Sequence, residues 1–170
     1  MTTTGFATAD FDLWPSFAKT ILVGIMFIGA CAGSTGGGIK VSRLLLYLRQ
    51  MKRGLRQQIH PRTVKVIKME GKGVELNTIR MANVFLISYL LIFAVSILIV
   101  SLDGFSFATN FTAVAATINN IGPGLEQVGP TANFADFSLL SKIVLMFDML
   151  AGRLEILPMV LVFHPTTWKR

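Results

Sequence analysis

The sequence predicts an all-α membrane protein, built from repeats of a helix, a short pore helix, a turn and a second helix, with one small β-hairpin. Three observations favour this class. Of the 170 residues, 52% are hydrophobic and only 15% are charged, whereas about 45–50% apolar residues are usual in a soluble domain. The apolar residues lie in blocks rather than at amphipathic spacing. Two glycine-containing turns each stand beside a long apolar segment.

The first apolar segment, residues 17–32, is sixteen residues long. As a helix it would span about 24 Å, less than the roughly 30 Å of a hydrocarbon core. A glycine loop follows it, consisting of Gly33, Ser34, Thr35, Gly36, Gly37 and Gly38, and a helical pattern resumes over residues 39–48. Each glycine costs a helix about 1 kcal/mol relative to alanine. Irregular backbone at membrane depth is tolerated where protein covers it or where it lines a wet cavity, so we expect this loop to face a pore.

Two other interpretations of the glycine loop were weighed. Gly33 and Gly38 have the spacing of a phosphate-binding loop, but Ile39 stands where a lysine must follow and no strand precedes the loop. The sequence therefore argues against a nucleotide site here. A passive break in a helix remains the alternative to a pore-facing loop.

The net charge of +7 is concentrated in one segment. Eleven of the sixteen Lys and Arg residues lie in residues 40–80, opposed only by Glu70 and Glu75. The positive-inside rule places such a segment in the cytoplasm, and its single aromatic residue, Tyr47, argues against nucleic-acid binding. Within it, residues 64–69 and 74–76 flank a glycine-rich turn and predict a small cytoplasmic hairpin.

The second half of the chain predicts one complete repeat. Residues 81–102 carry no charge and would span about 33 Å as a helix that leaves the cytoplasm. Residues 105–118 are too short to cross and predict a re-entrant pore helix, from which residues 119–124 return as extended backbone. Residues 125–136 then form an outer loop, and residues 137–163 return to the cytoplasmic side as the last helix.

Two turns are candidates for an ion pathway, because a turn between two spans can aim backbone carbonyls at a permeating ion. Their residues are Thr3, Thr4, Gly5 and Phe6 in the first turn, and Asn120, Ile121, Gly122 and Pro123 in the second. Glycine permits the positive φ that such carbonyl alignment needs, and proline keeps its carbonyl. A plain turn between helices is the alternative interpretation of either one.

The chain contains a faint internal repeat. Three residues recur at a constant offset of 123 positions: Phe11, Lys19 and Gly29 match Phe134, Lys142 and Gly152. Each copy follows a glycine turn, and each helical run ends at a His-Pro pair, at residues 60–61 and 164–165. Together with the two turns, this predicts an ion pathway built from repeats.

Arg153 lies within the last apolar segment, about 15 Å from its cytoplasmic end, where an arginine costs a few kcal/mol or more. Asp148 and Glu155 are five and two residues away, which is not the three- or four-residue spacing of a pair on one helix face. We expect the partner of Arg153 to be a pore carbonyl, the glycine loop or another helix, a structural salt bridge being the alternative. Asp148 and Glu155 share a face and are expected to meet basic groups of neighbouring helices.

Several classes of protein are disfavoured by what the sequence lacks. The single Cys31 excludes an internal disulfide and a cysteine-built metal site. The sequence has no paired catalytic carboxylates, nucleophile–base set or metal cluster, and no cleavable signal peptide. We therefore expect neither an enzyme nor a bound cofactor.

Four motifs in register resemble the Trk/Ktr/HKT superfamily of potassium transporters, and most closely its bacterial Trk-type membrane subunit. They are the first turn with Thr8 and Asp10 after it, the glycine loop, the second turn, and the run Gly152-Arg153-Leu154-Glu155. Members of this family carry four helix–pore–helix repeats around one pore. The resemblance implies a K⁺-channel-like architecture in which residues 1–62 end the third repeat, residues 63–80 form a linker with the hairpin, and residues 81–170 form the fourth repeat.

The resemblance also implies roles for these residues. The two turns would form a K⁺ selectivity filter, with K⁺ held at Thr4, Gly5, Ile121 and Gly122. The glycine loop would be the gate, and Arg153 a charge lining the pore. K⁺ would be the transported ion, with or without Na⁺ coupling.

The partners implied by the resemblance are the lipid bilayer, the missing N-terminal repeats, a second copy in a homodimer and a cytoplasmic nucleotide-binding regulatory subunit. The location would be the bacterial cytoplasmic (inner) membrane, as a multi-pass protein. The alternative from a different class is a non-conducting membrane interaction protein that binds anionic lipid or a partner through its basic residues 40–80.

Overall fold

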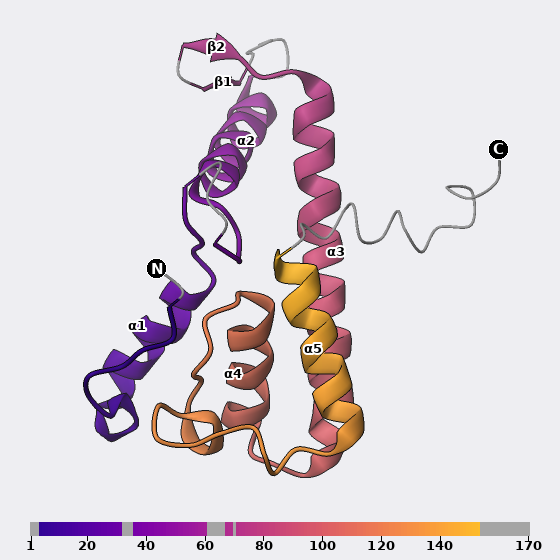
Figure 1. Cartoon of the computed structure of the whole chain (residues 1–170). Helices are drawn as coiled ribbons and strands as arrows, with labels where there is room; N and C mark the ends of the chain where they lie inside the picture. The colour runs from indigo at the N-terminus through magenta and orange to yellow at the C-terminus, as the bar shows by residue number, and fades with distance from the viewer. Residues whose placement is uncertain (1–3, 32–35, 61–66, 70, 154–170) are drawn as a thin grey trace, which may run out of the picture.

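The computed structural model describes residues 4–31, 36–60, 67–69 and 71–153. These residues are mostly helical (Figure 1), as the sequence predicts. In chain order the elements are η1 (Phe11–Leu13), α1 (Ser16–Met26), α2 (Val41–Ile59), β1 (Lys68–Met69), β2 (Lys72–Gly73), α3 (Leu76–Val100), η2 (Ser101–Asp103), α4 (Phe107–Ile118), η3 (Glu126–Val128) and α5 (Leu139–Arg153).

The longest helix is α3, with 25 residues. It contains the predicted uncharged span and begins earlier, at Leu76. Within the described part of the chain, one helix is long and apolar enough to cross a membrane, and it comprises α3 and η2. The apolar helices α1 and α4 are shorter, and α4 packs against α3.

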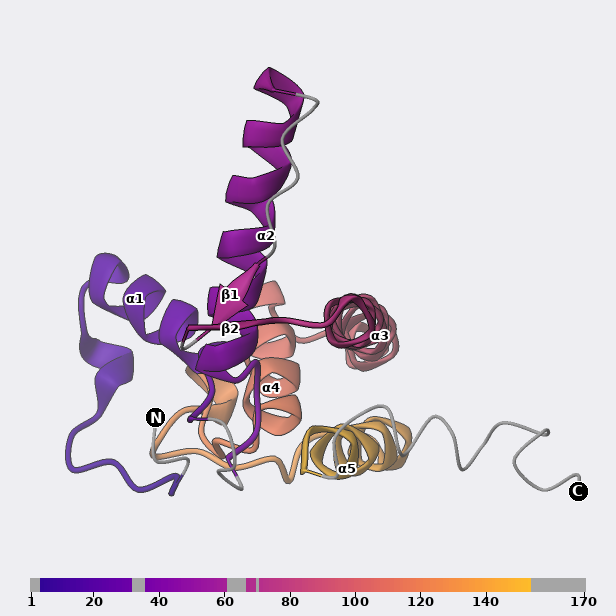
Figure 2. The ribbon, with the colours of Figure 1, turned by 90° about the horizontal axis from the view of Figure 1, so that it is seen from above.

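The core lies where α4 packs between longer helices. In the view of Figure 1 the chain runs downward along α3 and upward along α4. It then returns in extended backbone and runs upward again along α5. Seen from above, α4 is surrounded by α1, α3 and α5 (Figure 2). Ala113, Val114 and Ala115 of α4 are fully buried. The small alanine side chains let the neighbouring helices approach closely. A short helix within residues 105–118 is therefore confirmed as a buried element, and its re-entrant position in a membrane stays a prediction.

The predicted helix over residues 17–32 is wrong at its end, because α1 stops at Met26. The backbone that leaves α1 instead pairs with the backbone that enters α2: the Gly29 N–H donates to Ile39 O at 2.9 Å, and the Ile39 N–H donates to Phe27 O at 3.2 Å. These N–H groups are therefore not available for helical bonds. The non-helical segment is thus longer than the glycine run alone.

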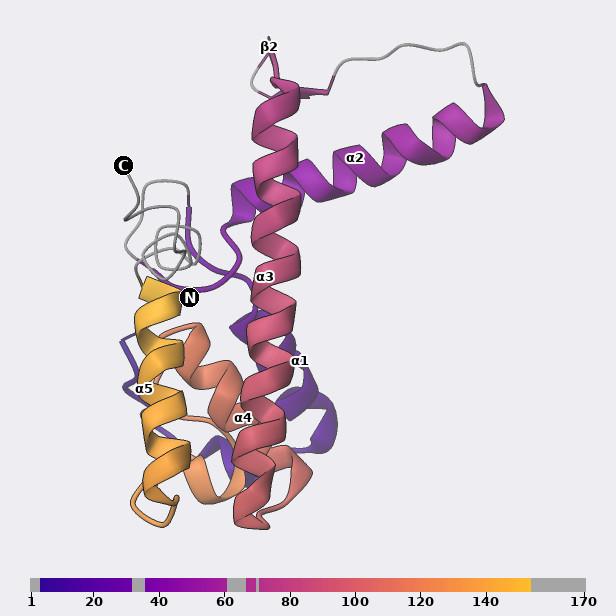
Figure 3. The same cartoon turned by 90° about the vertical axis from the view of Figure 1, so that its right-hand side faces the viewer.

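The helix after the glycine loop, α2, continues past residue 48 and ends at Ile59 with His60 as its C-cap, next to the predicted His-Pro pair. It projects away from α3 (Figure 3). Its first half packs on α3 through Leu46, which joins Ile67, Ile79 and Ala82 in a buried apolar cluster.

The hairpin is present but smaller than predicted. Lys68 pairs with Gly73 and Met69 pairs with Lys72, around Gly71, whose φ is +79°. The prediction of a second strand over residues 74–76 is wrong, because the strand lies at Lys72–Gly73, within the predicted turn, and α3 begins at Leu76. Val74 adds one further bond, from its N–H to Ile67 O at 2.8 Å. Residues 64–66 of the first predicted strand lie outside the described residues.

The two segments related by the offset of 123 begin alike. The Asp12 N–H donates to Asp10 Oδ1 at 3.0 Å, and the Ala135 N–H donates to Asn133 Oδ1 at 2.9 Å. The helices that follow start at Ser16 and Leu139, which differ by the same offset. This shared turn and helix start agree with the repeat seen in the sequence.

Candidate functional site

The two predicted turns lie against one another. Gly5 has φ +74° and Gly122 has φ +111°, so the predicted positive φ is confirmed at both. A Cβ at Gly5 would lie 2.9 Å from Ile121 O and 3.7 Å from Pro123 Cδ, and a Cβ at Gly122 would lie 3.5 Å from Gly5 Cα. The structure therefore brings together two turns whose glycines are 117 residues apart in the sequence.

The turns are open on one side. Thr4, Gly5, Phe6 and Gly122 are exposed, and a pocket of about 220 Å³ lies between the first turn, Ile121 and α1. Thr3 of the first turn lies outside the described residues. Two turns can surround an ion on only part of its circumference. A site that encircles the ion would therefore need further backbone oxygens from other segments.

The second turn is held by the end of α4. The Asn120 N–H donates to Thr117 O at 3.0 Å, and the Ile121 N–H donates to Ala116 O at 2.8 Å. The extended backbone that follows the second turn is held by the Leu125 N–H, which donates to Thr112 Oγ1 at 3.0 Å. The carboxyl end of α4 thus points at the turn, and the partial negative charge of a helix C-terminus favours a cation there.

The glycine loop packs against this same end of α4. A Cβ at Gly37 would lie 2.5 Å from Asn119 O, and a Cβ at Gly38 would lie 2.9 Å from Asn119 Oδ1. Gly38 also has φ +81°, which disfavours any side chain. Gly36, Gly37 and Gly38 are among the described residues, whereas Gly33, Ser34 and Thr35 are not. Gly37 and Gly38 are therefore required by close approach to Asn119, the residue before the second turn.

The helix α5 contacts the end of α4 as well. A Cβ at Gly152 would lie 1.9 Å from Ile118 O, and Asn120 Nδ2 donates to Met149 O at 3.1 Å. Arg153 follows directly and is exposed at the end of the described α5. The loop glycines thus meet Asn119 and Asn120, and α5 meets Ile118 and Asn120, so both contact the end of α4. Direct contact between Arg153 and the loop stays a prediction.

The prediction for Asp148 is wrong. Its side chain is fully buried and its Oδ1 accepts a hydrogen bond of 2.8 Å from the Ser96 hydroxyl of α3, rather than pairing with a basic group. Its Oδ2 is buried with no hydrogen-bond partner in the described structure. Glu155, predicted to share its face, lies outside the described residues.

Sequence reasoning missed Tyr89 and gave Asn119 no role of its own. Tyr89, in α3, is 2% exposed, and its hydroxyl donates to Asn119 Oδ1 at 2.9 Å. A signal was available: Tyr89 is the only tyrosine in the long apolar span, and a buried tyrosine hydroxyl usually requires a partner.

The buried short helix α4, the long apolar α3 and the paired glycine turns are the features that the sequence predicts for a helical membrane protein. The chain belongs to the TrkH family of cation transport proteins, whose family model matches residues 1–169. This confirms the resemblance seen in the four motifs.

The relatives and a solved structure agree with the family. The chain is 42% identical over 168 residues to the Trk system potassium uptake protein TrkH of Vibrio parahaemolyticus, which covers 99% of this chain and 34% of the relative. It is 39% identical over 168 residues to TrkH of Escherichia coli, with the same coverage of 99% and 34%. The crystal structure of the potassium transporter TrkH from Vibrio parahaemolyticus matches with a TM-score of 0.88 and 42% identity, over 99% of this chain and 36% of that one. The chain thus spans about a third of the length of these relatives, which are named as transport proteins and not as enzymes.

Proposed function

We propose that this chain contributes part of a channel-like pore for potassium uptake across the bacterial cytoplasmic membrane. The observation that carries the proposal is the direct contact of two positive-φ glycine turns at the carboxyl end of α4. The names of the relatives, Trk system potassium uptake proteins, support K⁺ as the ion.

The proposed filter works through backbone oxygens. Carbonyls of Thr4, Gly5, Ile121 and Gly122 replace part of the hydration shell of K⁺ without a full charge that would trap the ion. The end of α4 adds a partial negative charge beside them. The remaining oxygens would come from the repeats that make up the other two thirds of the relatives.

The proposed gate is the glycine loop, with Arg153 as the positive charge beside the pore. Gly37 and Gly38 pack on Asn119, the residue that precedes the second turn. An ion that leaves the turns toward this side meets the loop first. A short glycine-rich segment without side chains can move aside at low steric cost.

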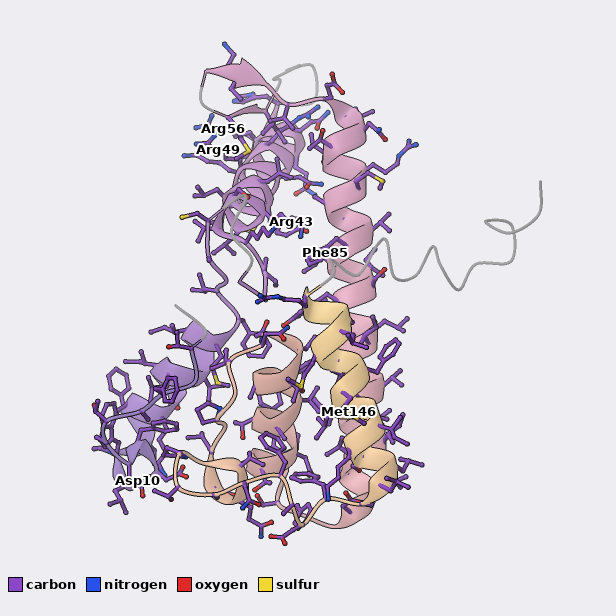
Figure 4. All side chains as sticks on the ribbon, viewed as in Figure 1. Asp10, Arg43, Arg49, Arg56, Phe85 and Met146 are labelled. Carbon is purple, nitrogen blue, oxygen red and sulfur yellow. The ribbon has the colours of Figure 1, made fainter. Side chains whose placement is uncertain are left out.

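The N-terminal repeats of the relatives are proposed to cover the open side of α4 and α5. A groove of about 620 Å³ lies there, lined mostly by apolar residues such as Ile121, Phe134, Leu145 and Met146. Figure 4 places Met146 on α5. A groove of this character needs either lipid or protein over it, and the relatives are about three times as long as this chain.

The homodimer and the cytoplasmic nucleotide-binding regulatory subunit also remain proposals. Their support is α2, whose exposed apolar residues Leu48, Met51 and Leu55 stand beside basic residues. Figure 4 shows Arg49 and Arg56 at the end of the molecule opposite Asp10. Such a mixed surface suits a protein partner on the cytoplasmic side.

The same observation favours the second candidate function, lipid binding without conduction. A basic amphipathic helix that projects from a membrane span can lie in the interface and bind anionic lipid. Flotation of the purified chain with vesicles, with and without phosphatidylglycerol, measures this binding. Transport by the protein would contradict the non-conducting alternative, whatever the lipid result.

The filter is tested in a chimaera in which these residues replace the matching segment of the Vibrio parahaemolyticus relative. Gly122→Ser should lower K⁺ over Na⁺ discrimination by roughly tenfold, because a side chain disfavours the positive φ that aligns the carbonyls. Uptake of the two ions in proteoliposomes measures the ratio. Gly71→Ser, at a positive-φ glycine of the hairpin with nothing within 4 Å of its Cβ position, is the control. Unchanged discrimination in Gly122→Ser would mean that this turn is not the filter.

A further inference from the structure

Asn119 is held in one orientation by two hydrogen bonds. Its Nδ2 donates to Ala115 O at 2.8 Å, and its Oδ1 accepts from the Tyr89 hydroxyl at 2.9 Å. Because the amide nitrogen can only donate, the Ala115 bond fixes which end of the side chain is the oxygen. Asn119 is 1% exposed, so both bonds are shielded from water.

Both oxygens of Asn119 also face the glycine loop. A Cβ at Gly37 would meet the main-chain oxygen at 2.5 Å, and a Cβ at Gly38 would meet Oδ1 at 2.9 Å. The loop backbone therefore rests directly on the oxygen that Tyr89 holds. A rotation of the Asn119 side chain would change the surface on which Gly38 packs.

Tyr89 is itself fixed within α3. Its ring stacks on Phe85 at a centroid distance of 6.2 Å and on Phe93 at 6.4 Å. Phe85 in turn carries the Arg43 guanidinium of α2 over its face at 4.0 Å (Figure 4). One turn of α3 thus contacts Asn119 through Tyr89 and the start of α2 through Phe85.

We propose that Tyr89 and Asn119 are positioning residues that hold Gly37 and Gly38, the described end of the glycine loop, against the end of α4. One part of this inference rests on the proposed function, namely that the loop held in this position restricts ion flow. The positioning itself does not rest on that function. Neither residue is expected to touch the ion in the filter, so they set how often the pathway is open and not which ion is chosen.

The test replaces Tyr89 by phenylalanine, which removes the hydroxyl and keeps the stacked ring. The readout is Cys31, the single cysteine of the chain, which is exposed and lies five positions before Gly36. Its rate of modification by a thiol reagent is measured on the full chain in membrane vesicles. Loss of a buried hydrogen bond is worth about 1 kcal/mol, so we expect roughly fivefold faster modification in Tyr89→Phe.

Two further variants complete the design. Asn119→Ala should accelerate modification as well, and the double variant should add little to either single change, because both remove the same contact. Ser96→Ala is the matched control: it removes another buried hydroxyl of α3, which bonds Asp148 and not the loop. It should leave the rate at Cys31 unchanged.

Rubidium uptake by the chimaera then separates positioning from gating. Higher basal uptake in Tyr89→Phe, with unchanged K⁺ over Na⁺ discrimination, supports both the positioning role and the proposed gate. Faster Cys31 modification without higher uptake supports the positioning role and counts against the loop as a gate. The positioning role is overturned if neither Tyr89→Phe nor Asn119→Ala changes the modification rate, if Ser96→Ala accelerates it equally, or if Tyr89→Phe merely abolishes insertion.

Discussion

The two segments related by the offset of 123 positions start with the same turn and the same helix, and then diverge. In the second segment the helix α5 continues through Gly152 to Arg153. In the first segment α1 ends at Met26, and the chain folds back so that Gly29 pairs with Ile39. One copy is therefore a continuous helix and the other is a helix with a broken end.

Gly29 and Gly152, which match at the offset of 123, allow a close backbone contact in each segment, but the contact is a different one. Gly152 allows α5 to dock on α4, since a Cβ there would lie 1.9 Å from Ile118 O. Gly29 allows the chain to close on its own loop, since a Cβ there would lie 2.5 Å from Gly37 O. The first contact joins two helices of the core, and the second joins two parts of one loop. If the glycine loop is the gate proposed above, the second segment is the support and the first is the element that moves.

The largest effect is expected at Gly152. Gly152→Val would place a branched side chain against the carbonyl of Ile118, and neither helix backbone can yield without losing core contacts. We expect a loss of stability of about 3 kcal/mol or more, seen as a lower thermal midpoint in detergent and less inserted protein. Gly24→Ala in α1 is the control, because nothing lies within 4 Å of its Cβ position. A Gly152→Val variant as stable as the control would remove the distinction between support and movable element.

A smaller effect is expected at Gly29. Gly29→Ala would press against Gly37 O and push the two sides of the loop apart. We expect a stability loss of roughly 1 kcal/mol together with higher rubidium uptake per inserted molecule in the chimaera. Uptake that falls in proportion to stability would show that this glycine supports folding only.

The smallest effects are expected at the turns that the two segments share. Asp10→Ala and Asn133→Ala each remove one hydrogen bond to a main-chain N–H, worth about 0.5–1.5 kcal/mol. The two losses should be similar, and ion discrimination should not change in either variant. Thermal midpoints of the two variants measured side by side test this, and a large difference between them would show that the turns are not equivalent.

The sequence was sufficient for the elements whose pattern is local. The uncharged span predicted α3, the short apolar run predicted α4, and glycine at positions 5 and 122 predicted positive φ. Each depends on the length of an apolar run or on the conformational range of one residue type.

The features that the sequence did not predict depend on contacts between distant segments. The end of α1 is set by the hydrogen bond between Gly29 and Ile39, which lie on opposite sides of the glycine loop. No local sequence pattern predicts that these two residues pair. Asp148 was expected to meet a basic group, but its neighbour is Ser96, 52 positions away. The Tyr89–Asn119 bond joins α3 to the end of α4 in the same way. Such pairs become visible only when the helices are packed.

The most direct test of the central claim is rubidium uptake by the chimaera, normalised to inserted protein, for Arg153→Ala, for deletion of residues 34–37 and for both together. If the loop and Arg153 restrict the same pathway, each single change raises uptake, since one opens the path and the other removes a cation beside it. The double change then gives less than the combined effect of the two singles, as expected for coupled neighbours. Uptake that falls with expression in Arg153→Ala, or effects that combine independently, would contradict the claim.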